Sequence, residues 1–360
     1  MSDITPQLLE QVREAAESGT ALAISGGGSK AFMGRGRKGE PLSLADHTGV
    51  VSYHPVELVL TVRAGTRLSE IDAVLAEHNQ RMAFDPPRFS DSDVKSDTIG
   101  GTLACNLSGP GRPWQGSVRD HVLGVKLING QGQHLSFGGQ VMKNVAGYDA
   151  SRLQAGALGT LGVMTEISLK VLPLPAVELT LSRELPLAEA HALMAQLAGQ
   201  PKPLSAACWV NGTVYLRLSG ARSAVDATAE QWQQAHGLNL YEAGSEFWAL
   251  LRDQQLEFFA GDRPLWRFSV NPTAPMQDIG NGVLVDWGGG QRWSRAEASL
   301  SDMAAYAARA GGQVSLFRGG DRSGEVMHPQ PAPLRTIQQR LKASFDPRRI
   351  FNPGHLYSWL

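Results

Sequence analysis

The chain has 360 residues, of which 42% are hydrophobic, and it contains 40 glycines and 2 cysteines. This composition excludes a disordered chain, a collagen and a disulfide-rich scaffold. Its 33 Lys and Arg residues balance 34 Asp and Glu residues, which leaves a formal net charge of −1. A nucleic-acid partner is therefore not expected, and the basic cluster at residues 35–38 is interpreted as a solvated loop because a glycine interrupts it.

The sequence contains no run of about 18 apolar residues, and residues 1–19 lack the basic-then-apolar order of a signal peptide. We therefore expect a cytoplasmic protein without a transmembrane segment, and leave open a peripheral attachment to the inner membrane through partner subunits. Cys105 and Cys208 belong to no CxxC motif, so no disulfide, zinc site or iron–sulfur cluster is expected from this chain alone. Any redox centre must then be organic or be held by a partner.

The first half begins with a helix, because Thr5 and Pro6 form a start signal, apolar residues follow at helical spacing, and Gly19 stands where a C′ residue belongs. Apolar runs, turn signals and a second helical pattern predict the remaining elements of this half. These are a strand at 21–24, a loop at 25–30, a strand at 58–62, a helix capped by Thr66, a hairpin of strands 122–128 and 133–137 around Asn129-Gly130, and a strand at 163–171.

Two prolines, Pro173 and Pro175, end this half, and the composition changes after them: seven of the eight tryptophans lie beyond residue 200. The second half alternates strands with helices, which predicts an α+β layer with an antiparallel sheet. The expected strands are 179–182, 206–210, 214–218 and 283–286, and the expected helices are 187–197, 224–236 and 295–309.

A glycine loop, SGGGSK at residues 25–30, follows the first strand. Its first and third glycines match a dinucleotide fingerprint, but that motif must open a helix, and the glycines and proline at residues 34–41 would break one. A P-loop is excluded because Ala31 replaces the Ser or Thr that would hold Mg²⁺. Two interpretations remain: an anion nest whose N–H groups bind phosphate, helped by the Ser29 hydroxyl and the Lys30 charge, or an ordinary surface turn.

Two further glycine-rich segments follow along the chain. Residues 97–109 place Gly100 and Gly101 before an apolar helical turn, and adjacent glycines let backbone approach a flat ligand closely. Residues 148–163 carry three glycines and lead directly into a strand. Each segment alone is compatible with plain turn chemistry, whereas the three segments in this order form a stronger signal for a binding site.

The order of these motifs resembles the PCMH-type FAD-binding domain of the vanillyl-alcohol oxidase family. The sequence is also similar, over nearly the whole chain, to the family of FAD-binding E subunits of bacterial glycolate oxidase. The segments that carry this second similarity are SKAFMGR at 29–35, GPGRPWQGSVRD at 109–120, FGGQVMKNVAGYD at 137–149, DWGG at 286–289 and FNPG at 351–354.

The resemblance implies an α+β fold: a PCMH-type FAD-binding domain of two α/β subdomains at residues 1–175, an antiparallel-sheet α+β cap domain at 176–335, and a C-terminal segment at 336–360 that returns to the FAD domain. It also implies that the FAD pyrophosphate lies on the first glycine loop, the isoalloxazine near residues 100–109 and the adenosine half along the third segment. The implied cofactor-binding residues are Ser25, Gly26, Gly27, Gly28, Ser29, Lys30, Gly100, Gly101, Thr102, Asn106, Gly109, Gly159, Gly162 and Val163.

The sequence departs from the wider family in two respects. Many relatives hold the flavin covalently through a histidine in the first loop, and Gly28 stands at that place here, so we expect non-covalent FAD. Catalytic 2-hydroxy-acid oxidases of the family coordinate a metal through a histidine cluster, but the nine histidines here form no HxH or HxxxH pair, so no metal site is expected. The catalytic residues are left unassigned. Candidates are Lys143, inside a subunit-specific segment, Arg318, as a carboxylate clamp, and His328 or His355, as a general base.

The resemblance implies a subunit of a glycolate oxidase (dehydrogenase) complex, which converts glycolate to glyoxylate. Because the chain has too few cysteines for a cluster, electrons would leave through an iron–sulfur partner subunit. The missing histidine cluster indicates that a sister flavoprotein subunit oxidises the substrate, while this chain relays electrons or completes the assembly. Two alternatives stay open: an autonomous FAD-dependent oxidase of a small 2-hydroxy acid or sugar, and a non-catalytic assembly subunit that binds FAD weakly or not at all.

Overall fold

The computed structural model describes residues 2–89, 96–139, 149–277, 280 and 282–360, and the chain divides into two compact units. The first unit comprises Met1–Leu107, Ser117–Pro173 and Arg322–Leu360, and the second comprises Ser108–Gly116 and Leu174–Asp321. The main excursion out of the first unit thus runs from Leu174 to Asp321, whereas the sequence led us to expect boundaries at 175 and 335.

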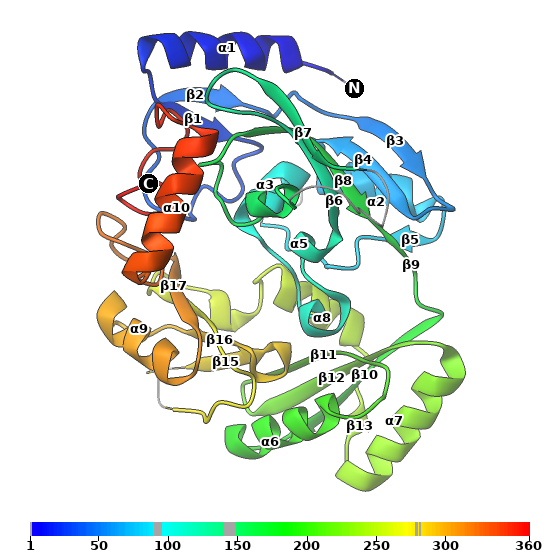
Figure 1. Ribbon diagram of the computed structural model, residues 1–360. Helices are drawn as coiled ribbons and strands as arrows, with labels where there is room; N and C mark the ends of the chain where they lie inside the picture. The colour runs from blue at the N-terminus through cyan, green and yellow to red at the C-terminus, as the bar shows by residue number, and fades with distance from the viewer. Residues whose placement is uncertain (1, 90–95, 140–148, 278–279, 281) are drawn as a thin grey trace. The chain divides into compact units, whose positions relative to one another are not determined.

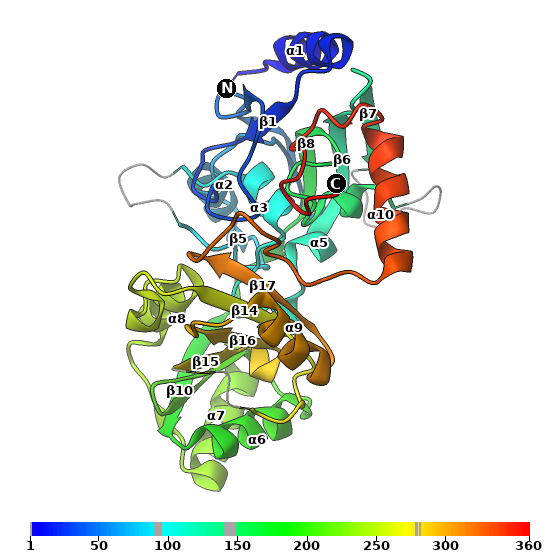
Figure 2. The same ribbon diagram turned by 90° about the vertical axis from the view of Figure 1, so that its left-hand side faces the viewer.

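The first unit is built around an antiparallel five-stranded sheet with the order β3-β4-β8-β6-β7, and it also contains the parallel pair β1-β2. In Figure 1, α1 lies next to β1 and β2, Figure 2 again shows it next to β1, and the apolar side of this helix is buried. The elements of this unit are α1 (Thr5–Ser18), β1 (Leu22–Ser25), β2 (Glu40–Ser43), β3 (Val50–His54), β4 (Val59–Arg63), α2 (Leu68–Ala76), β5 (Gln80–Arg81), α3 (Ile99–Cys105), α5 (Val118–His121), β6 (Val122–Ile128), β7 (His134–Gly138), the 3-10 turn η1 (Ser151–Gln154), β8 (Val163–Lys170), β9 (Leu172–Pro173) and α10 (Ala332–Phe345).

The second unit contains an eight-stranded sheet with the order β13-β10-β12-β11-β15-β16-β14-β17, and all its described strand pairs are antiparallel. Helix α6 packs against β11, and helix α7 packs against β10 and β12 (Figure 2). The elements are α4 (Arg112–Gln115), β10 (Val177–Glu184), α6 (Leu187–Ala198), β11 (Leu204–Val210), β12 (Thr213–Gly220), α7 (Arg222–His236), β13 (Asn239–Leu240), α8 (Gly244–Arg252), the 3-10 turn η2 (Glu257–Phe259), β14 (Leu265–Ser269), β15 (Val283–Asp286), the 3-10 turn η3 (Trp287–Gly289), β16 (Gln291–Ser294), α9 (Leu300–Arg309) and β17 (Gln313–Arg318).

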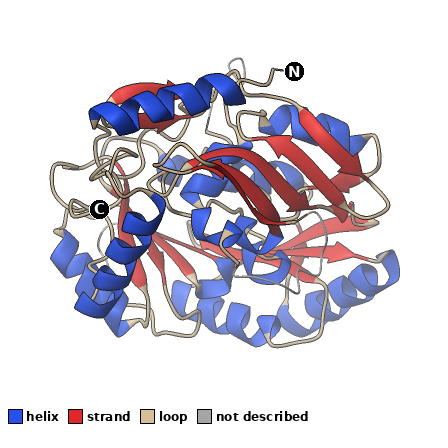
Figure 3. Cartoon of the chain, turned by 45° about the horizontal axis from the view of Figure 1, so that its top comes forward, coloured by secondary structure: helices blue, strands red, loops and turns tan. Residues whose placement is uncertain are grey.

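Both units combine helices with sheets, as the colouring of Figure 3 makes visible, so the predicted α+β class and the antiparallel sheet of the second half are confirmed. The opening helix is confirmed too, and it ends as expected at Gly19, which has a φ of 74° in the left-handed region that glycine favours. Its start is shifted by one residue, because Ile4 and not Thr5 occupies the N-cap. The predicted hairpin is present as β6 and β7.

The predicted start of the last helix of the second half is wrong. The helix expected from residue 295 begins at Leu300, where the Ser299 side chain accepts a hydrogen bond from the Asp302 amide as N-cap. Arg295 is instead buried and donates to backbone carbonyls, among them that of Arg263 at 2.7 Å. A charged residue that serves as a hydrogen-bond donor to carbonyl groups looks, in sequence, the same as one on the exposed face of a helix.

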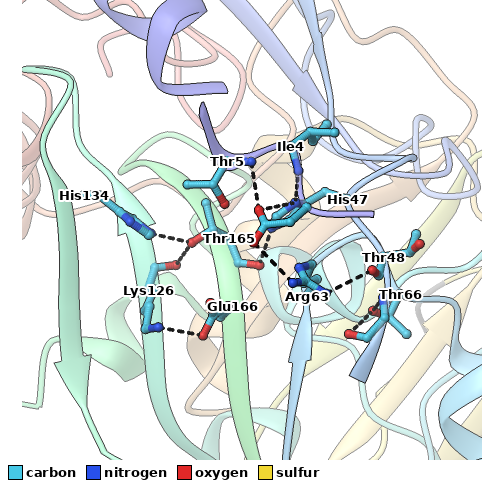
Figure 4. A network of polar contacts seen from close by, with 12 residues as sticks. Ile4, Thr5, His47, Thr48, Arg63, Thr66, Lys126, His134, Thr165 and Glu166 are labelled. Carbon is cyan, nitrogen blue, oxygen red and sulfur yellow. Dashed lines mark hydrogen bonds and ion pairs between the residues drawn. The ribbon is translucent and has the colours of Figure 1, made fainter. Parts of the chain in front are cut away.

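Thr66 does not cap α2, whose N-cap is Arg67. The Thr66 hydroxyl accepts a hydrogen bond from the Gly49 amide at 2.9 Å and donates to the Gly49 carbonyl at 3.3 Å. Figure 4 shows Thr66 beside Thr48 and Arg63. The hydroxyl therefore connects the start of α2 to the segment before β3, and the first turn of α2 is left without this cap.

A buried histidine connects α1, β8 and the segment before β3 (Figure 4). His47 is fully buried, its Nδ1 accepts a hydrogen bond from the Ile4 amide at 3.2 Å, and its Nε2 lies 3.1 Å from the Thr165 carbonyl. These partners require a neutral ring with the proton on Nε2. Burial is the main cause that lowers the pKa of His47 below 6.5, although the nearby Asp3 carboxylate opposes it.

Candidate cofactor-binding site

A pocket in the first unit collects the first glycine loop, part of α3, the segment before β8 and the C-terminal segment. It contains about 770 Å³ of space between atoms, part of it open to solvent. The described residues that line it are Ile24, Ser25, Gly26, Gly27, Gly28, Ser29, Lys30, Ala31, Arg37, Leu44, Ala64, Thr98, Gly100, Gly101, Ala104, Cys105, Leu158, Gly159, Gly162, Met164, Asn352 and His355.

The first glycine loop follows β1 as irregular turns and no helix, as the glycines and proline after it predict. Among the described residues, the backbone N–H groups of Gly27, Gly28 and Ser29 have no hydrogen-bond acceptor. Gly28 has a φ of 83°, and successive N–H groups around such a residue converge into an anion-binding concavity. A Cβ on Gly27 would lie 1.7 Å from the Ser96 carbonyl oxygen, so this position admits only glycine.

Lys30 lines the pocket, but its charge is already paired. Its Nζ lies 2.5 Å from Asp97 Oδ1, and the two side chains are 6% and 4% exposed. The Ser29 hydroxyl donates to the same oxygen at 2.6 Å, and the Phe89 amide donates to Oδ2 at 3.0 Å. The carboxylate therefore fixes the end of the glycine loop, and the net charge that Lys30 can offer an anion is reduced.

Helix α3 forms a second wall of the pocket. Gly100 and Gly101 lie inside its first turn, whereas the sequence led us to expect them before the helix. Thr98 is the N-cap, and its hydroxyl accepts a hydrogen bond from the Gly101 amide at 3.2 Å. A Cβ on Gly100 would lie 2.7 Å from the Ala64 carbonyl oxygen. Gly100 therefore allows α3 to approach the backbone after β4, and it packs there while also lining the pocket.

The third wall combines Leu158, Gly159 and Gly162 with the C-terminal Asn352. The Asn352 side chain is buried, its Oδ1 accepts a hydrogen bond from the Ile24 amide at 2.8 Å, and its Nδ2 donates to the Leu158 carbonyl at 2.7 Å. Segments that are far apart in sequence are thus connected directly at the pocket.

The structure brings ten of the fourteen residues proposed for FAD binding to one pocket, namely Ser25, Gly26, Gly27, Gly28, Ser29, Lys30, Gly100, Gly101, Gly159 and Gly162. The other four do not line it. Thr102 and Val163 are fully buried in α3 and β8, and the Asn106 backbone is the C-cap of α3. Gly109 belongs to the second unit, where its carbonyl accepts a hydrogen bond from Trp287 Nε1 at 3.0 Å.

The candidate catalytic residues are not brought together by the structure. Lys143 lies outside the described residues. Arg318 belongs to the second unit and donates to Gln254 Oε1 at 2.9 Å. His328 does not line the pocket, and burial lowers the pKa of its ring. In the part of the chain that the structure describes, no three His, Cys, Asp or Glu side chains gather as a metal site requires.

Four pocket residues with hydroxyl, amide or nitrogen-bearing side chains were not proposed as cofactor ligands from the sequence: Arg37, Thr98, Asn352 and His355. Arg37 adds a positive charge at the pocket, and its guanidinium donates to the Ile24 carbonyl at 3.1 Å. It stands in the basic cluster that we interpreted as a solvated loop. Asn352 belongs to the FNPG motif, which was the one signal for its importance, but its sequence position alone does not indicate what it contacts.

His355 is 6% exposed and its Nδ1 lies 2.5 Å from the Arg35 carbonyl. Burial is the main cause that lowers the pKa of His355 to about 4; the Arg35 contact opposes it, and the Arg37 and Arg322 cations lower it further. At pH 7 the ring is therefore neutral. A base with this pKa is too weak to hold a proton effectively near neutral pH.

We expect the stability of the chain to fall in mild acid because of His355. The unfolded ring takes up a proton near pH 6.5, whereas the folded ring does so only near pH 4, so stability is complete above pH 6.5 and is lost as the pH falls toward 4. This residue should lower the free energy of unfolding by about 2 kcal/mol between pH 7 and pH 5. Urea unfolding at both pH values measures the difference.

The matched pair for this measurement is His355→Asn and His54→Asn, since His54 is exposed. His355→Asn should show a drop between the two pH values that is smaller by about 2 kcal/mol. His54→Asn should behave as the unmodified chain does. An unchanged drop in His355→Asn would show that the ring titrates normally.

These residues fit the diphosphate of a dinucleotide such as FAD. Among the described residues the N–H groups of Gly27, Gly28 and Ser29 have no acceptor, and Arg37 lines the same pocket. Glycines stand where a Cβ would meet backbone. Converging N–H dipoles are suited to negatively charged oxygens, and glycine backbone lets a flat ring approach closely. The arrangement can hold and orient a flavin dinucleotide, but it presents no strong acid or base among the described lining residues.

Comparison with known proteins agrees with this geometry. A family model described as an FAD binding domain matches residues 5–138. Among solved structures, an alkyldihydroxyacetonephosphate synthase superimposes with a TM-score of 0.65 and 15% identity, covering 97% of this chain and 75% of that one. At this identity the likeness shows the fold alone, and it confirms the predicted PCMH-type architecture. No helix in the described part of the chain has both the length and the apolar character needed to cross a membrane.

Relatives among characterised sequences are closer. The chain is 35% identical over 124 residues to glycolate oxidase subunit GlcD of Bacillus subtilis, which covers 34% of this chain and 25% of that subunit. It is 31% identical over 137 residues to a D-lactate dehydrogenase of Anaerostipes hadrus, covering 38% and 28% of the two chains. Over 358 residues, 99% of both chains, it is 44% identical to glycolate oxidase subunit GlcE of Escherichia coli K12. The chain therefore carries an FAD-binding domain and belongs to the family of glycolate oxidase subunit GlcE.

Proposed function

We propose that this chain is the FAD-binding subunit of a complex that oxidises glycolate to glyoxylate. The observation that carries the proposal is the 44% identity to subunit GlcE over 99% of both chains. The pocket supports it, because the residues that line it suit a dinucleotide. When bound, FAD would accept two electrons from a hydroxy acid or a partner and pass them on.

Within this proposal the residues of the chain have distinct roles. The N–H groups of Gly27, Gly28 and Ser29 would bind the diphosphate, and Arg37 would add charge to that end of the pocket. Asp97 would keep the loop in place through Lys30 and Ser29. The fourteen residues named from the resemblance remain proposals, and the ten at the pocket have the support of their position.

The partners in this proposal are a sister flavoprotein subunit of the GlcD type and an iron–sulfur subunit. The similarity to a GlcD chain supports the first. The cysteine count supports the second, because an iron–sulfur cluster uses about four thiolates and this chain has 2 cysteines, of which Cys208 is fully buried. A cytoplasmic location, with any membrane attachment made through the other subunits, belongs to the same proposal.

We further propose that the sister subunit oxidises glycolate and that this chain relays electrons. The titratable groups that line the pocket support this assignment. Lys30 is paired with Asp97, Arg37 is a guanidinium, and His355 has a pKa of about 4, so none of these three is suited to take a proton from a hydroxyl group at pH 7. Cys105, the remaining titratable lining residue, is partly exposed.

The test is to purify the chain alone and in its complex, and to add glycolate without oxygen while recording the flavin absorption band. We expect bleaching in the complex and none in the isolated chain. Bleaching of the isolated chain would overturn the relay and favour an autonomous oxidase. A colourless chain that still assembles with its partners would favour a scaffold without FAD.

We expect the FAD to be bound without a covalent link, because Gly28 stands where covalently flavinylated relatives have histidine. Precipitation with trichloroacetic acid should leave the yellow flavin in the supernatant. Adding free FAD to an unrelated protein before precipitation provides the recovery control. Yellow colour that stays in the washed pellet would contradict the expectation.

A further inference from the structure

We propose that Asn352 is a positioning residue for two glycine loops of the pocket, the loop at residues 25–30 and the loop at residues 158–162. Its carboxamide sets the distance between these loops, and FAD affinity depends on it. The inference rests on the proposed FAD-binding role of those loops. It concerns a residue of the C-terminal segment that the glycine motifs themselves do not include.

The carboxamide uses its two ends on two different loops. Its Oδ1 accepts from the Ile24 amide at 2.8 Å, one residue before the first glycine loop begins at Ser25. Its Nδ2 donates to the Leu158 carbonyl at 2.7 Å, next to Gly159 in the other loop. The side chain is 2% exposed, so both hydrogen bonds are protected from competition with water. A single planar group therefore fixes the distance between Ile24 and Leu158.

The backbone around Asn352 holds the amide in this place. Its N–H donates to the Leu22 carbonyl at 3.0 Å, and the Leu22 N–H donates to the Ile350 carbonyl at 2.7 Å, so the C-terminal segment pairs with β1. Asn352 has a φ of 41°, in the left-handed region that asparagine tolerates better than most residues. The backbone hydrogen bonds thus fix the position from which the Asn352 side chain reaches Ile24 and Leu158.

The second loop is held against the amide under some strain. Leu158 has a φ of 49°, which is costly for a residue with a branched side chain, and its own N–H donates to the Ala104 carbonyl at 2.9 Å. A Cβ on Gly159 would lie 2.8 Å from Asn352 Nδ2, so no space remains between loop and amide. Such a conformation persists only where the surrounding contacts determine it, and the Asn352 hydrogen bond is one of these contacts.

The chemistry of the contact requires an amide. The Ile24 N–H needs an acceptor and the Leu158 carbonyl needs a donor. An aspartate has the same size and can accept from Ile24, but in its ionised form it would face the Leu158 carbonyl without a proton to donate. It would also add a negative charge at a pocket that suits an anion. Asn352→Asp therefore changes the hydrogen bond and the charge with almost no change in volume.

A purely structural role can be distinguished from positioning by pH. In Asn352→Asp, protonation of the carboxyl restores a donor toward Leu158 and removes the charge. We therefore expect FAD affinity in this variant to be about 10–100-fold weaker than in the unmodified chain at pH 7.5 and to recover substantially at pH 5.5. The unmodified chain has no such group at this position and should lack the recovery.

The experiment titrates the FAD-depleted full chain with FAD by isothermal calorimetry at both pH values, and records the unfolding curve of each FAD-free variant alongside. Asn211→Asp is the matched control, because Asn211 is exposed in the second unit and undergoes the same chemical change. Asn352→Ser, which is too short to reach both partners, is the second variant if Asn352→Asp fails to fold, and its FAD affinity should be weakened at both pH values.

Three results would overturn the proposal: FAD affinity equal to that of the unmodified chain in either folded variant, an affinity loss matched by Asn211→Asp, or an Asn352→Asp loss that does not change with pH. These results require the unmodified chain to bind FAD. If the unmodified chain binds no FAD at all, the proposed function fails first, so the two failures are distinguishable.

Discussion

Replacing Lys342 by methionine is expected to lower the free energy of unfolding of the first unit by about 3–5 kcal/mol. The Lys342 side chain is 1% exposed and donates to Asp346 Oδ2 at 2.7 Å, to the Thr160 carbonyl at 2.7 Å and to the Phe351 carbonyl at 2.8 Å. Its three protons are all used. Methionine would fill a similar volume but leave the Asp346 carboxylate, which is 0% exposed, without its counter-ion.

Urea unfolding, followed by circular dichroism, measures this effect. Arg340→Met is the control, because Arg340 lies exposed on the same helix, α10, and its replacement should change the free energy of unfolding by no more than about 0.5 kcal/mol. Adding Asp346→Asn to Lys342→Met should cost less than the sum of the two single changes, since it removes the unpaired charge. Stability equal to that of Arg340→Met would mean that the ion pair contributes nothing.

Replacing Gly27 by alanine is expected to weaken FAD binding by about 10–100-fold. The new Cβ would lie 1.7 Å from the Ser96 carbonyl oxygen, a backbone atom that cannot rotate away, so the loop itself must move. Its N–H groups would then no longer converge on one position. The flavin-to-protein absorbance ratio of the purified chain and a titration with FAD measure the loss.

Gly36→Ala provides the matched control for this prediction. Gly36 lies in irregular backbone directly after the turns of this loop, and a Cβ there would meet nothing within 4 Å. This variant should bind FAD as the unmodified chain does. If Gly27→Ala kept its full flavin content, the first glycine loop would not be the diphosphate site.

The sequence identified many of the elements whose apolar pattern has a clear period, although the amphipathic helices α8 and α10 were missed. In α2, Leu68, Ile71 and Leu75 point to the core at helical spacing, and all three are at most 1% exposed. Strand β16 was missed because its four residues, Gln291–Ser294, are all buried although three of them are polar. Arg292 there donates to carbonyl groups and to the Tyr306 hydroxyl at 2.7 Å. Polar residues that are buried because they form hydrogen bonds do not produce a hydrophobic period in the sequence.

The residues of the pocket likewise fall into those that the sequence indicated and those that it did not. The glycine loops were found because glycine is required locally, by a turn or by close backbone contact, and such requirements show in the sequence. The contact between Asn352 and Ile24 spans 328 residues and depends on where the chain returns after the second unit. The pairing of Lys30 with Asp97 was missed for a similar reason, because it forms across 67 residues. Tertiary structure alone determines these partners.

The return of the C-terminal segment to β1 also affects how the protein is made. The pocket needs Met164 and Asn352, which are 352 − 164 = 188 residues apart. At about 5–20 residues per second, the ribosome takes roughly 10–40 s to synthesise that stretch. During this time the first unit is without the segment that joins its loops, while the residues of the second unit are being made. The cofactor is therefore expected to enter only near the end of translation or after it, and a cell short of FAD would accumulate chains with an unfinished pocket.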